Sequence, residues 1–338
     1  MSLFSCFSSA AAPTRGPPVD VLLLGSGWTA TFLLPLLGTS SLSCAWTTRA
    51  GGNGALPFDF DPSSDSYAAF ERLPDAKTIV VVFPLYEAAA VEFLLRAYRE
   101  TRESDCAPGW IQLGSTGIWD HGPTFAPAPP TYGTKPLASS SSSPWKNRHS
   151  PHTSAPRAVA EDALLSHSNT SVLNLSGLWG HGRSPRRYIG ALAPSKEKLA
   201  QLGSVHLVHG LDVARAILAM HVQWEKARGE RWLLTNERVY DLWDLCARWG
   251  NGGEEGRNHP PAGPQPGWVQ ELIAESRSDH ALDNGGEVGE EKKKHKKHHA
   301  HRDPIRSLPR SVEQMGAALD GTDFWSTFGL TPAVPWVD

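Results

Sequence analysis

A short aliphatic run followed by a glycine turn lies near the start of the chain. Residues 20–24 read Asp-Val-Leu-Leu-Leu, and Gly25-Ser-Gly27-Trp-Thr-Ala30 and the apolar stretch Phe32–Leu37 follow. A continuous aliphatic run is typical of a parallel strand that is buried on both faces. A glycine turn after such a strand directs the amides of the next helix toward a pyrophosphate. The pattern therefore predicts a dinucleotide site.

The spacing of the turn assigns a role to each of its small residues. Gly25 permits the tight turn, Gly27 lets the backbone approach a pyrophosphate, and Ala30 allows close packing of helix on strand. The other turn residues are further candidate cofactor contacts: Ser26, Trp28 and Thr29. An ordinary tight turn is the alternative for so short a motif.

Apolar runs alternate with helical patterns along the rest of the chain. The further predicted strands are Ile79–Phe83, Trp110–Leu113, Val172–Leu175 and Val205–Val208, with Leu42–Thr47 and Arg231–Leu234 as weaker examples. The predicted helices are Glu87–Tyr98, Asp212–Trp224, for which Asp212 is the expected N-cap, and Val239–Trp249. This alternation predicts an α/β fold with a doubly wound, mostly parallel Rossmann sheet.

Changes in composition divide the chain into segments. We predict a disordered tail over 1–18, a dinucleotide-binding Rossmann domain over 19–249, a low-complexity and largely disordered insertion over 250–305, and a small C-terminal subdomain remnant over 306–338. Within the Rossmann domain, residues 121–156 hold eight prolines, which predicts a long mobile loop. The insertion shows no hydrophobic periodicity apart from Trp268–Ile273.

The insertion ends in a tract rich in lysine and histidine, residues 292–302. Nuclear localisation, nucleic-acid binding and metal binding are three functions that fit such a tract. The histidines concerned are His295, His298, His299 and His301. Acidic residues precede the tract, and no aromatic residue lies among its lysines to stack on bases. We therefore favour a solvated linker and expect neither a nucleic-acid partner nor a metal site.

Composition and cysteine spacing limit the cellular compartments in which we expect the protein. The net charge is −3, and no apolar run reaches the roughly 18 residues that span a bilayer. Residues 1–18 lack the basic start of a secretory signal. The cysteines show no paired spacing, which indicates a reducing compartment: Cys6, Cys44, Cys106 and Cys246. We expect a cytoplasmic protein without a membrane anchor, with a nuclear location as the alternative if the basic tract is a localisation signal.

Further motifs follow the glycine turn in a fixed order. They are Phe83-Pro84, Leu113-Gly-Ser-Thr-Gly-Ile-Trp119, Leu175-Ser-Gly-Leu-Trp-Gly-His-Gly-Arg183 and Val208-His-Gly-Leu-Asp-Val-Ala214. With them the chain resembles the extended short-chain dehydrogenase/reductase superfamily, particularly its atypical NAD(P)-dependent epimerase/dehydratase-like members, over residues 19–120 and 157–249. The resemblance implies an NAD(P) site, with Phe83 and Pro84 beside the cofactor, Asp59 near the adenine and Ser115 as the active-site serine.

The end of the second strand bears on the choice of cofactor. A carboxylate at this position binds the ribose hydroxyls of NAD, but the chain reads Trp46-Thr-Thr-Arg49. Arg49 can bind a 2′-phosphate in a forked geometry while Thr47 and Thr48 donate their hydroxyls. We therefore predict NADP, with NAD as the alternative. Arg49 as a plain surface charge is the other interpretation.

The catalytic residues of the superfamily are not all present. Its reductases use a serine with Tyr-x-x-x-Lys, a motif that this chain lacks, and Arg157 and Glu161 occupy the expected spacing. Arginine stays protonated at neutral pH, and a glutamate has the wrong charge to lower the pKa of a tyrosine. The usual proton transfer is therefore in doubt.

Three interpretations of these positions remain open. Tyr132, in the proline-rich loop, is a candidate surrogate acid. Alternatively, Arg157 and Glu161 form an ion pair that shapes a substrate pocket, while Ser115 and Thr116 hold the substrate oxygen and water supplies the proton. The third interpretation is an ordinary helix pair at i and i+4.

In the family that the chain resembles, the loop with His209 borders the substrate site, which implies two substrate contacts: Arg183, for an anionic group, and His209. A simple turn residue is the alternative for His209. The sequence leaves open whether the chain is an enzyme. The first hypothesis is an NADP-dependent oxidoreductase or epimerase with an unknown small organic substrate. The second is a non-catalytic NADP sensor or scaffold that binds a partner protein.

Overall fold

The computed structural model describes residues 15–102, 107–120, 143–252, 262–284 and 303–337. Its contacts divide the chain into two units. Unit 1 comprises Met1–Gly114, Pro156–Val172 and Ala214–Glu230, and unit 2 comprises Ser115–Ala155, Leu173–Val213 and Arg231–Asp338. Each unit has a hydrophobic core of its own.

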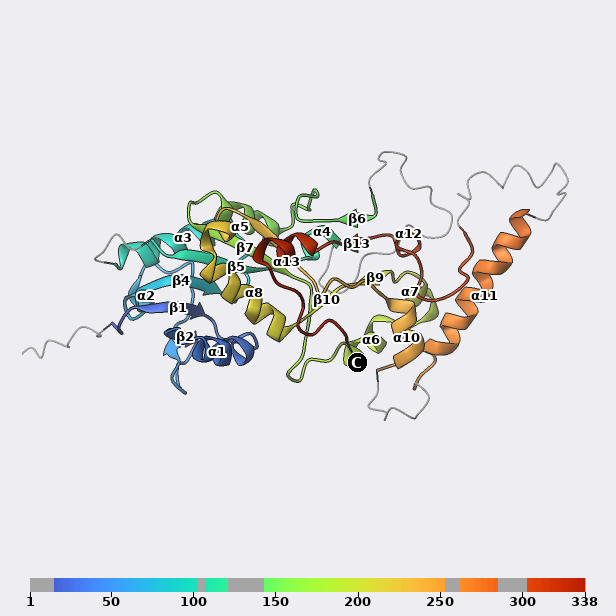
Figure 1. The fold of residues 1–338 in the computed structure, drawn as a ribbon, viewed down its shortest axis with the longest axis horizontal. Helices are drawn as coiled ribbons and strands as arrows, with labels where there is room; N and C mark the ends of the chain where they lie inside the picture. Colours follow the sequence, from blue (N-terminus) through green and yellow to red (C-terminus); the bar gives the residue numbers. More distant parts are fainter. Residues whose placement is uncertain (1–14, 103–106, 121–142, 253–261, 285–302, 338) are drawn as a thin grey trace, which may run out of the picture. The chain divides into compact units, whose positions relative to one another are not determined.

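Seven strands form the central sheet. They are β1 (Val19–Leu24), β2 (Cys44–Thr48), β3 (Leu56–Pro57), β4 (Ala76–Val81), β5 (Gly109–Ser115), β7 (Thr170–Leu175) and β11 (Arg231–Leu234). Their order is β11-β7-β5-β4-β1-β2-β3 (Figure 1). Leu22 lies opposite Ala45 of β2 and Ile79 of β4, and these strands are parallel. The predicted α/β fold with a doubly wound parallel sheet is confirmed.

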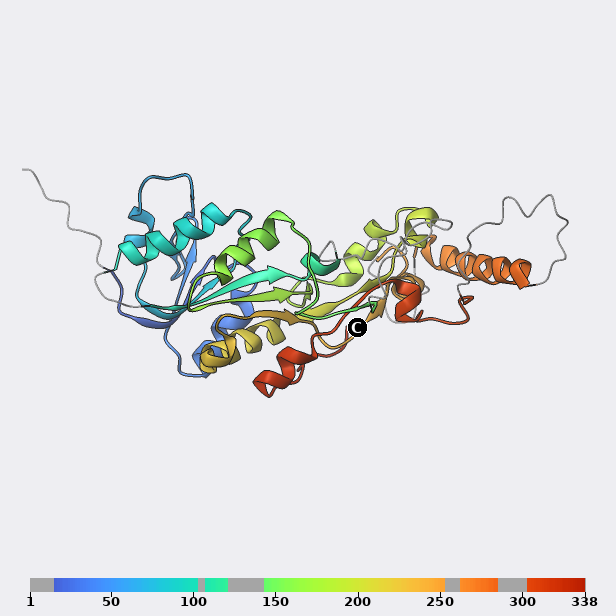
Figure 2. The ribbon, with the colours of Figure 1, turned by 90° about the horizontal axis from the view of Figure 1, so that it is seen from above.

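Both faces of the sheet in unit 1 are covered, as the continuous aliphatic runs predicted. Leu22 and Leu24 pack into a core that includes side chains of α3 (Ala88–Glu100) and α5 (Pro156–Leu165). The alternate residues Val21 and Leu23 are also fully buried. Figure 2 shows α3 and α5 on one side of the strands and α1 (Ala30–Thr39) and α8 (Gly210–Val222) on the other.

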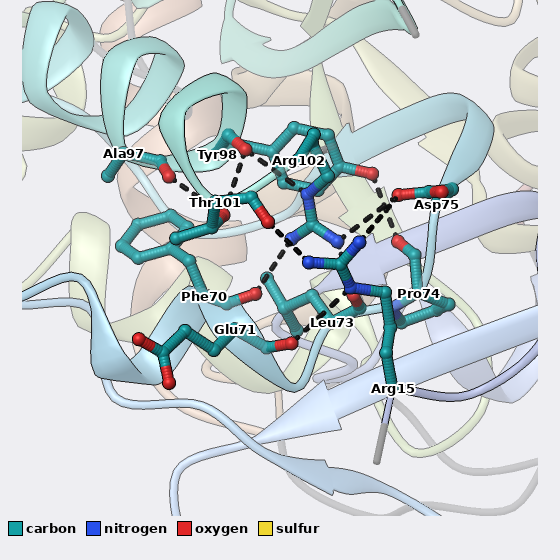
Figure 3. Close-up of polar contacts among 10 residues, drawn as sticks. All are labelled: Arg15, Phe70, Glu71, Leu73, Pro74, Asp75, Ala97, Tyr98, Thr101 and Arg102. Carbon is teal, nitrogen blue, oxygen red and sulfur yellow. Dashed lines mark hydrogen bonds and ion pairs between the residues drawn. The ribbon is translucent and has the colours of Figure 1, made fainter. Parts of the chain in front are cut away.

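A buried arginine, Arg102, binds several backbone carbonyls near the start of β4 in unit 1 (Figure 3). The Arg102 side chain, 1% exposed, donates to the carbonyls of Phe70, Leu73 and Tyr98, and its Nη1 lies 3.3 Å from Asp75 Oδ1. Its guanidinium also lies 4.0 Å from the centre of the Tyr98 ring. These contacts join the end of α3 to α2 (Ala68–Glu71) and to the segment between α2 and β4. Arg102 therefore satisfies backbone carbonyls that belong to no ladder.

Unit 2 contains three two-stranded sheets. The pairs are β8 (Gly177–Trp179) with β10 (Leu207–His209), β9 (Ser204–Val205) with β12 (Tyr240–Asp241), and β6 (Trp145–Lys146) with β13 (Ala318–Leu319). The predicted single strand Val205–Val208 is therefore wrong. Its centre, His206, is buried and accepts a hydrogen bond from the amide of Leu319, so the chain changes partner there.

A long helix, α11 (Gln265–Asn284), lies within the segment for which we expected a largely disordered insertion. Val269, Leu272 and Ile273 are buried in the core of unit 2 with residues of α10 (Leu242–Trp249). The apolar stretch Trp268–Ile273 stabilises the helix, because its side chains pack with those of α10 in the core of unit 2. Lys196 of α7 (Lys196–Ala200) also pairs with Glu271 and Glu275 of α11.

The remaining helices are short. They are α4 (Gly117–Asp120), α6 (Pro185–Leu192), α9 (Trp224–Ala227), α12 (Val312–Met315) and α13 (Thr322–Phe328). Over the described ranges, no helix combines the length and the apolar character needed to cross a membrane. The lysine- and histidine-rich tract lies outside the described residues, and so does Tyr132.

Candidate functional site

The glycine turn lies between β1 and α1, as the sequence predicted. Gly25 has φ +79° and Gly27 has φ +48°, a region that favours glycine. A Cβ on Gly25 would lie 3.1 Å from Cδ1 of Phe83, whereas one on Gly27 would lie 3.8 Å from the Val82 side chain. Position 25 therefore requires glycine for two reasons: its φ is positive, and the Phe83 ring leaves little room for a Cβ. Gly27 is exposed, so a ligand can approach its backbone.

Thr47 of β2 holds this turn in place. Its hydroxyl accepts a hydrogen bond from the Gly25 amide at 2.8 Å, and its carbonyl accepts one from Ser26 at 2.9 Å. The Thr47 side chain is fully buried. The neighbouring Thr48 donates its hydroxyl to the carbonyl of Gly51 at 3.1 Å. Both threonine hydroxyls thus make contacts within the protein; Thr47 is fully buried, Thr48 is half-buried and Arg49 is exposed.

Arg49 follows the last residue of β2. Its side chain is 92% exposed, and Nε lies 3.8 Å from Oδ1 of Asp59, which is itself 76% exposed. The two residues that we associated with the adenine and the 2′-phosphate are therefore neighbours. An ion pair this exposed contributes little to stability and leaves the guanidinium accessible to an anion.

The other turn residues differ in accessibility. Thr29 is buried, whereas Ser26 and Trp28 are partly exposed. The Trp28 ring meets that of Phe32 edge to face, with 4.9 Å between their centres. This contact fixes the entry to α1, so Trp28 has a packing role in addition to any cofactor contact.

Phe83 and Pro84 follow β4, next to the glycine turn. The Phe83 ring stacks on Phe60 with 5.1 Å between the ring centres. Its carbonyl accepts a hydrogen bond of 3.0 Å from Nε2 of Gln112, a buried residue of β5. Our sequence interpretation missed Gln112. The signal was present, since it is the polar residue within the apolar run Trp110–Leu113.

Arg157 and Glu161 form the predicted i,i+4 pair on α5. Arg157 Nε lies 3.7 Å from Glu161 Oε1, and Glu161 is 2% exposed. Arg157 Nη2 also donates to the carbonyl of Leu113 at 3.1 Å. The pair therefore attaches α5 to β5 within unit 1. An ion pair with a purely structural role would make the same contacts.

In unit 2, Ser115 is the last residue of β5 and Thr116 is the first residue after it. The Ser115 hydroxyl accepts a hydrogen bond from the Gly117 amide at 3.2 Å, and its carbonyl accepts one from Asn174 Nδ2 at 3.1 Å. The Thr116 amide donates to the carbonyl of Leu175. Because the Ser115 oxygen is fixed as an acceptor, its own proton remains for donation to a second oxygen.

His209 ends β10 and packs against the loop that carries Arg183. Its ring lies edge to face with Trp179 at 4.6 Å, and its Nδ1 accepts from the Leu211 amide at 3.2 Å. A Cβ on Gly180 would lie 2.3 Å from His209 Nε2, so only glycine fits there. Burial lowers the pKa of His209, opposed by the Asp212 carboxylate. The ring is therefore neutral at pH 7, with the proton on Nε2.

Arg183 closes a turn next to this ring. Its backbone exchanges two hydrogen bonds with Gly180, and the residue is exposed. The turn fixes the backbone of Arg183 close to the histidine that we predicted beside it in the substrate site.

The predicted N-cap role of Asp212 is wrong. Helix α8 begins at Gly210, so Asp212 lies within its first turn. Its buried carboxylate accepts hydrogen bonds from the amides of Ala333, at 2.7 Å, and Val334, at 3.0 Å. Asp212 therefore binds the C-terminal segment of unit 2, a long-range contact that no local sequence pattern encodes.

The predicted site residues fall into two groups. Unit 1 holds the nucleotide candidates and the Arg157–Glu161 pair: Gly25, Ser26, Gly27, Trp28, Thr29, Thr48, Arg49, Phe83, Pro84, Arg157 and Glu161. Unit 2 holds the substrate candidates Ser115, Thr116, Arg183 and His209.

Comparisons with known proteins bear on the fold. No family model and no curated protein matches the sequence. A functionally unknown conserved protein from Silicibacter pomeroyi DSS is 13% identical, with a TM-score of 0.50 over 94% of this chain and 95% of that one. This similarity spans nearly all of both chains and shows the same overall fold.

Two further solved structures carry descriptions of a ligand or an activity. A short-chain dehydrogenase/reductase superfamily protein from Agrobacterium tumefaciens with bound NAD is 11% identical, with a TM-score of 0.47 over 78% of this chain and 99% of that one. UDP-N-acetylglucosamine 4-epimerase from Bacillus cereus is 10% identical, with a TM-score of 0.46 over 75% of this chain and 98% of that one.

Proposed function

We propose that the chain binds a nicotinamide dinucleotide at the carboxyl ends of β1, β2 and β4. The glycine turn carries this proposal, because Gly25 and Gly27 both adopt positive φ between a buried strand and a helix. Gly25 to Ala30 would hold the pyrophosphate, and Arg49 the adenine ribose. When bound, such a cofactor supplies a hydride acceptor or donor.

The first experiment measures binding to the whole chain. NADP, NADPH, NAD and NADH are titrated separately by calorimetry, and the thermal unfolding midpoint is recorded at each concentration. A ligand that binds only the folded state raises that midpoint as its concentration exceeds Kd. If none of the four raises it at millimolar concentration and none releases heat, the proposed function is wrong.

Arg49 is the basis for proposing NADP over NAD. Replacing it with alanine removes a charge-assisted hydrogen bond to the 2′-phosphate, so the Kd for NADP is expected to rise about tenfold or more while the Kd for NAD stays the same. Arg228→Ala, which removes another exposed arginine of unit 1, is the matched control. A parallel loss of NAD and NADP affinity in Arg49→Ala would contradict the assignment.

For the reaction, we propose an oxidoreductase or epimerase that acts on a small organic substrate with a carbonyl or hydroxyl group. Ser115 would donate a hydrogen bond from its hydroxyl to the substrate oxygen, since its own oxygen already accepts from Gly117, and water would supply the proton. Arg183 and His209 would bind the rest of the substrate. In Ser115→Ala, turnover of a carbonyl substrate is expected to fall about a hundredfold while the Kd for NADPH stays within about twofold.

A non-catalytic NADP sensor that binds a partner protein is the second candidate. One observation favours it: the Arg157–Glu161 pair, at the expected Tyr/Lys spacing, anchors α5 to the Leu113 carbonyl. On this proposal the wild-type protein binds NADPH but oxidises none with a panel of aldehydes and ketones. Turnover that is lost in Ser115→Ala would rule it out.

A further inference from the structure

Two buried polar side chains, Thr47 of β2 and Gln112 of β5, bind backbone groups just beyond the ends of β1 and β4. We propose that these side chains are positioning residues, which hold the glycine turn and the Phe83 segment in the geometry that a dinucleotide requires. The proposal rests on the proposed function, because it concerns the same site.

Thr47 acts on the glycine turn. Strand β1 ends at Leu24, so the Gly25 amide is the first after the strand, and it donates to the Thr47 hydroxyl rather than to a ladder carbonyl. The next amide, Ser26, donates to the Thr47 carbonyl. One residue of β2 thus orients two consecutive amides of the turn. The direction of the following residues, including exposed Gly27, depends on this anchor.

Gln112 acts on the segment after β4. Strand β4 ends at Val81, and Nε2 of Gln112 lies 3.0 Å from the Phe83 carbonyl and 3.4 Å from the Val81 carbonyl. The same nitrogen lies 3.0 Å from the Leu113 carbonyl. A single amide group therefore links the end of β4 to β5.

The two anchored segments touch each other. A Cβ on Gly25 would come within 3.1 Å of the Phe83 ring, and the Val82 amide donates to the Leu24 carbonyl at 3.0 Å. A shift of either segment would therefore displace the other. This coupling accounts for the burial of two polar side chains, Thr47 near the end of β2 and Gln112 in the middle of β5.

Gln112 shows a second feature that fits this role. Its Oε1 atom is buried and has no hydrogen-bond partner among the described residues. The side chain is 3% exposed, so this oxygen is a cost to folding that a leucine at the same place would avoid. An amide retained at that cost, with its nitrogen on the Phe83 carbonyl, indicates a requirement beyond packing.

Thr78 provides a matched control within unit 1. It is another buried threonine of the sheet, 3% exposed, whose hydroxyl lies 2.8 Å from Nδ1 of His221. It lies opposite Val21, near the start of β1, whereas the glycine turn follows the end of that strand. Thr78→Val therefore removes the same kind of buried hydrogen bond far from the proposed site.

The test compares the Kd for NADPH and the unfolding midpoint of the whole chain in five forms. These are the wild type, Thr47→Val, Thr47→Ser, Gln112→Met and Thr78→Val. We expect Kd to rise about tenfold in Thr47→Val and Gln112→Met, from the loss of one anchoring hydrogen bond and the shift that follows. Thr47→Ser keeps the hydroxyl and is expected to restore affinity to within about threefold of wild type. Thr78→Val should lower the unfolding midpoint and leave Kd unchanged.

The outcomes separate this proposal from the function on which it rests. A wild-type chain that does not bind NADPH overturns the proposed function and the inference with it. If the wild type binds and Thr47→Val or Gln112→Met has an unchanged Kd, the residue replaced in that variant is not a positioning residue. If Thr47→Val does not fold, Thr47→Ser decides for Thr47, since a folded serine variant with a tenfold loss would overturn its assigned role. If Gln112→Met does not fold, Gln112→Asn replaces it, and unchanged affinity with this shorter amide excludes the role of the Phe83 contact.

Discussion

Replacing Arg102 with methionine is expected to lower the free energy of unfolding of unit 1 by about 3 kcal/mol. Methionine fills much of the space of the arginine stem but donates no hydrogen bonds. The carbonyls of Phe70 and Leu73 would lose the guanidinium, and Asp75 would keep only the neighbouring Arg15, 3.7 Å away (Figure 3). Guanidinium denaturation followed by circular dichroism measures the change.

Arg99 offers the control for this variant. It is an exposed arginine in the last turn of α3, just before Arg102, and Arg99→Met is expected to change stability by less than about 0.5 kcal/mol. Arg102→Lys should recover only part of the loss, because an ammonium group does not reproduce the forked geometry that reaches three carbonyls. Equal stabilities for Arg102→Met and Arg99→Met would show that the Arg102 contacts contribute nothing.

The same variant connects stability with the proposed cofactor. A ligand that binds only folded protein adds about 2.7 kcal/mol at a concentration of 100 times Kd. NADPH should therefore restore most of the stability that Arg102→Met loses, without a new contact to residue 102. The Arg102 contacts lie near the start of β4, and the glycine turn at the opposite end of the adjacent β1. A restored midpoint would show that ligand binding stabilises the whole of unit 1.

Strands β1 and β4 could be predicted because each contains an unbroken run of aliphatic residues. Val21 to Leu24 are all fully buried, so the unbroken run directly reports burial on both faces. The glycine turn could be predicted for a similar reason: Gly25 and Gly27 adopt conformations that other residues rarely reach. In both cases a local physical requirement limits the residue types.

Contacts between distant segments could not be predicted in this way. Asp212 has the residue type and position of an N-cap, yet its carboxylate binds amides 121 and 122 residues further along. His206 divides an apolar run because a strand from the end of the chain donates to its ring. Gln112 lies within the predicted strand Trp110–Leu113, and only the position of the Phe83 carbonyl shows the contact that it makes. Such partners depend on the assembled fold.

In the candidate site, too, some features could be predicted from the sequence and others could not. We associated Arg49 with a 2′-phosphate and Asp59 with the adenine, each from its own motif, and the structure adds that the two side chains are neighbours. The role of Thr47 differs from the expectation, because its hydroxyl is directed inward to Gly25 rather than toward a phosphate. In a strand, successive side chains point to opposite faces, and the face that Thr47 occupies was not evident from Trp46-Thr-Thr-Arg49.

Asp241→Ala is expected to be the most destabilising single change in unit 2, with a loss of about 3–5 kcal/mol. The carboxylate is completely buried and accepts hydrogen bonds from the Trp243 amide, from the Arg310 amide, and from Nε and Nη2 of Arg310. Its removal leaves the N-terminus of α10 uncapped and the buried Arg310 guanidinium without its counter-charge. Denaturation followed by tryptophan fluorescence reports the change, because Arg310 lies 4.0 Å from the centre of the Trp243 ring.

A double variant distinguishes the loss of the pair from the cost of an unpaired charge. In Asp241→Ala with Arg310→Met, no charge remains buried, so stability should recover well above that of Asp241→Ala alone. Lys196→Ala, which removes an ion pair with exposed partners in the same unit, should have a much smaller effect than Asp241→Ala. If the double variant is as unstable as Asp241→Ala, the loss comes from the helix cap and the backbone contacts, since the unpaired guanidinium would then carry no penalty.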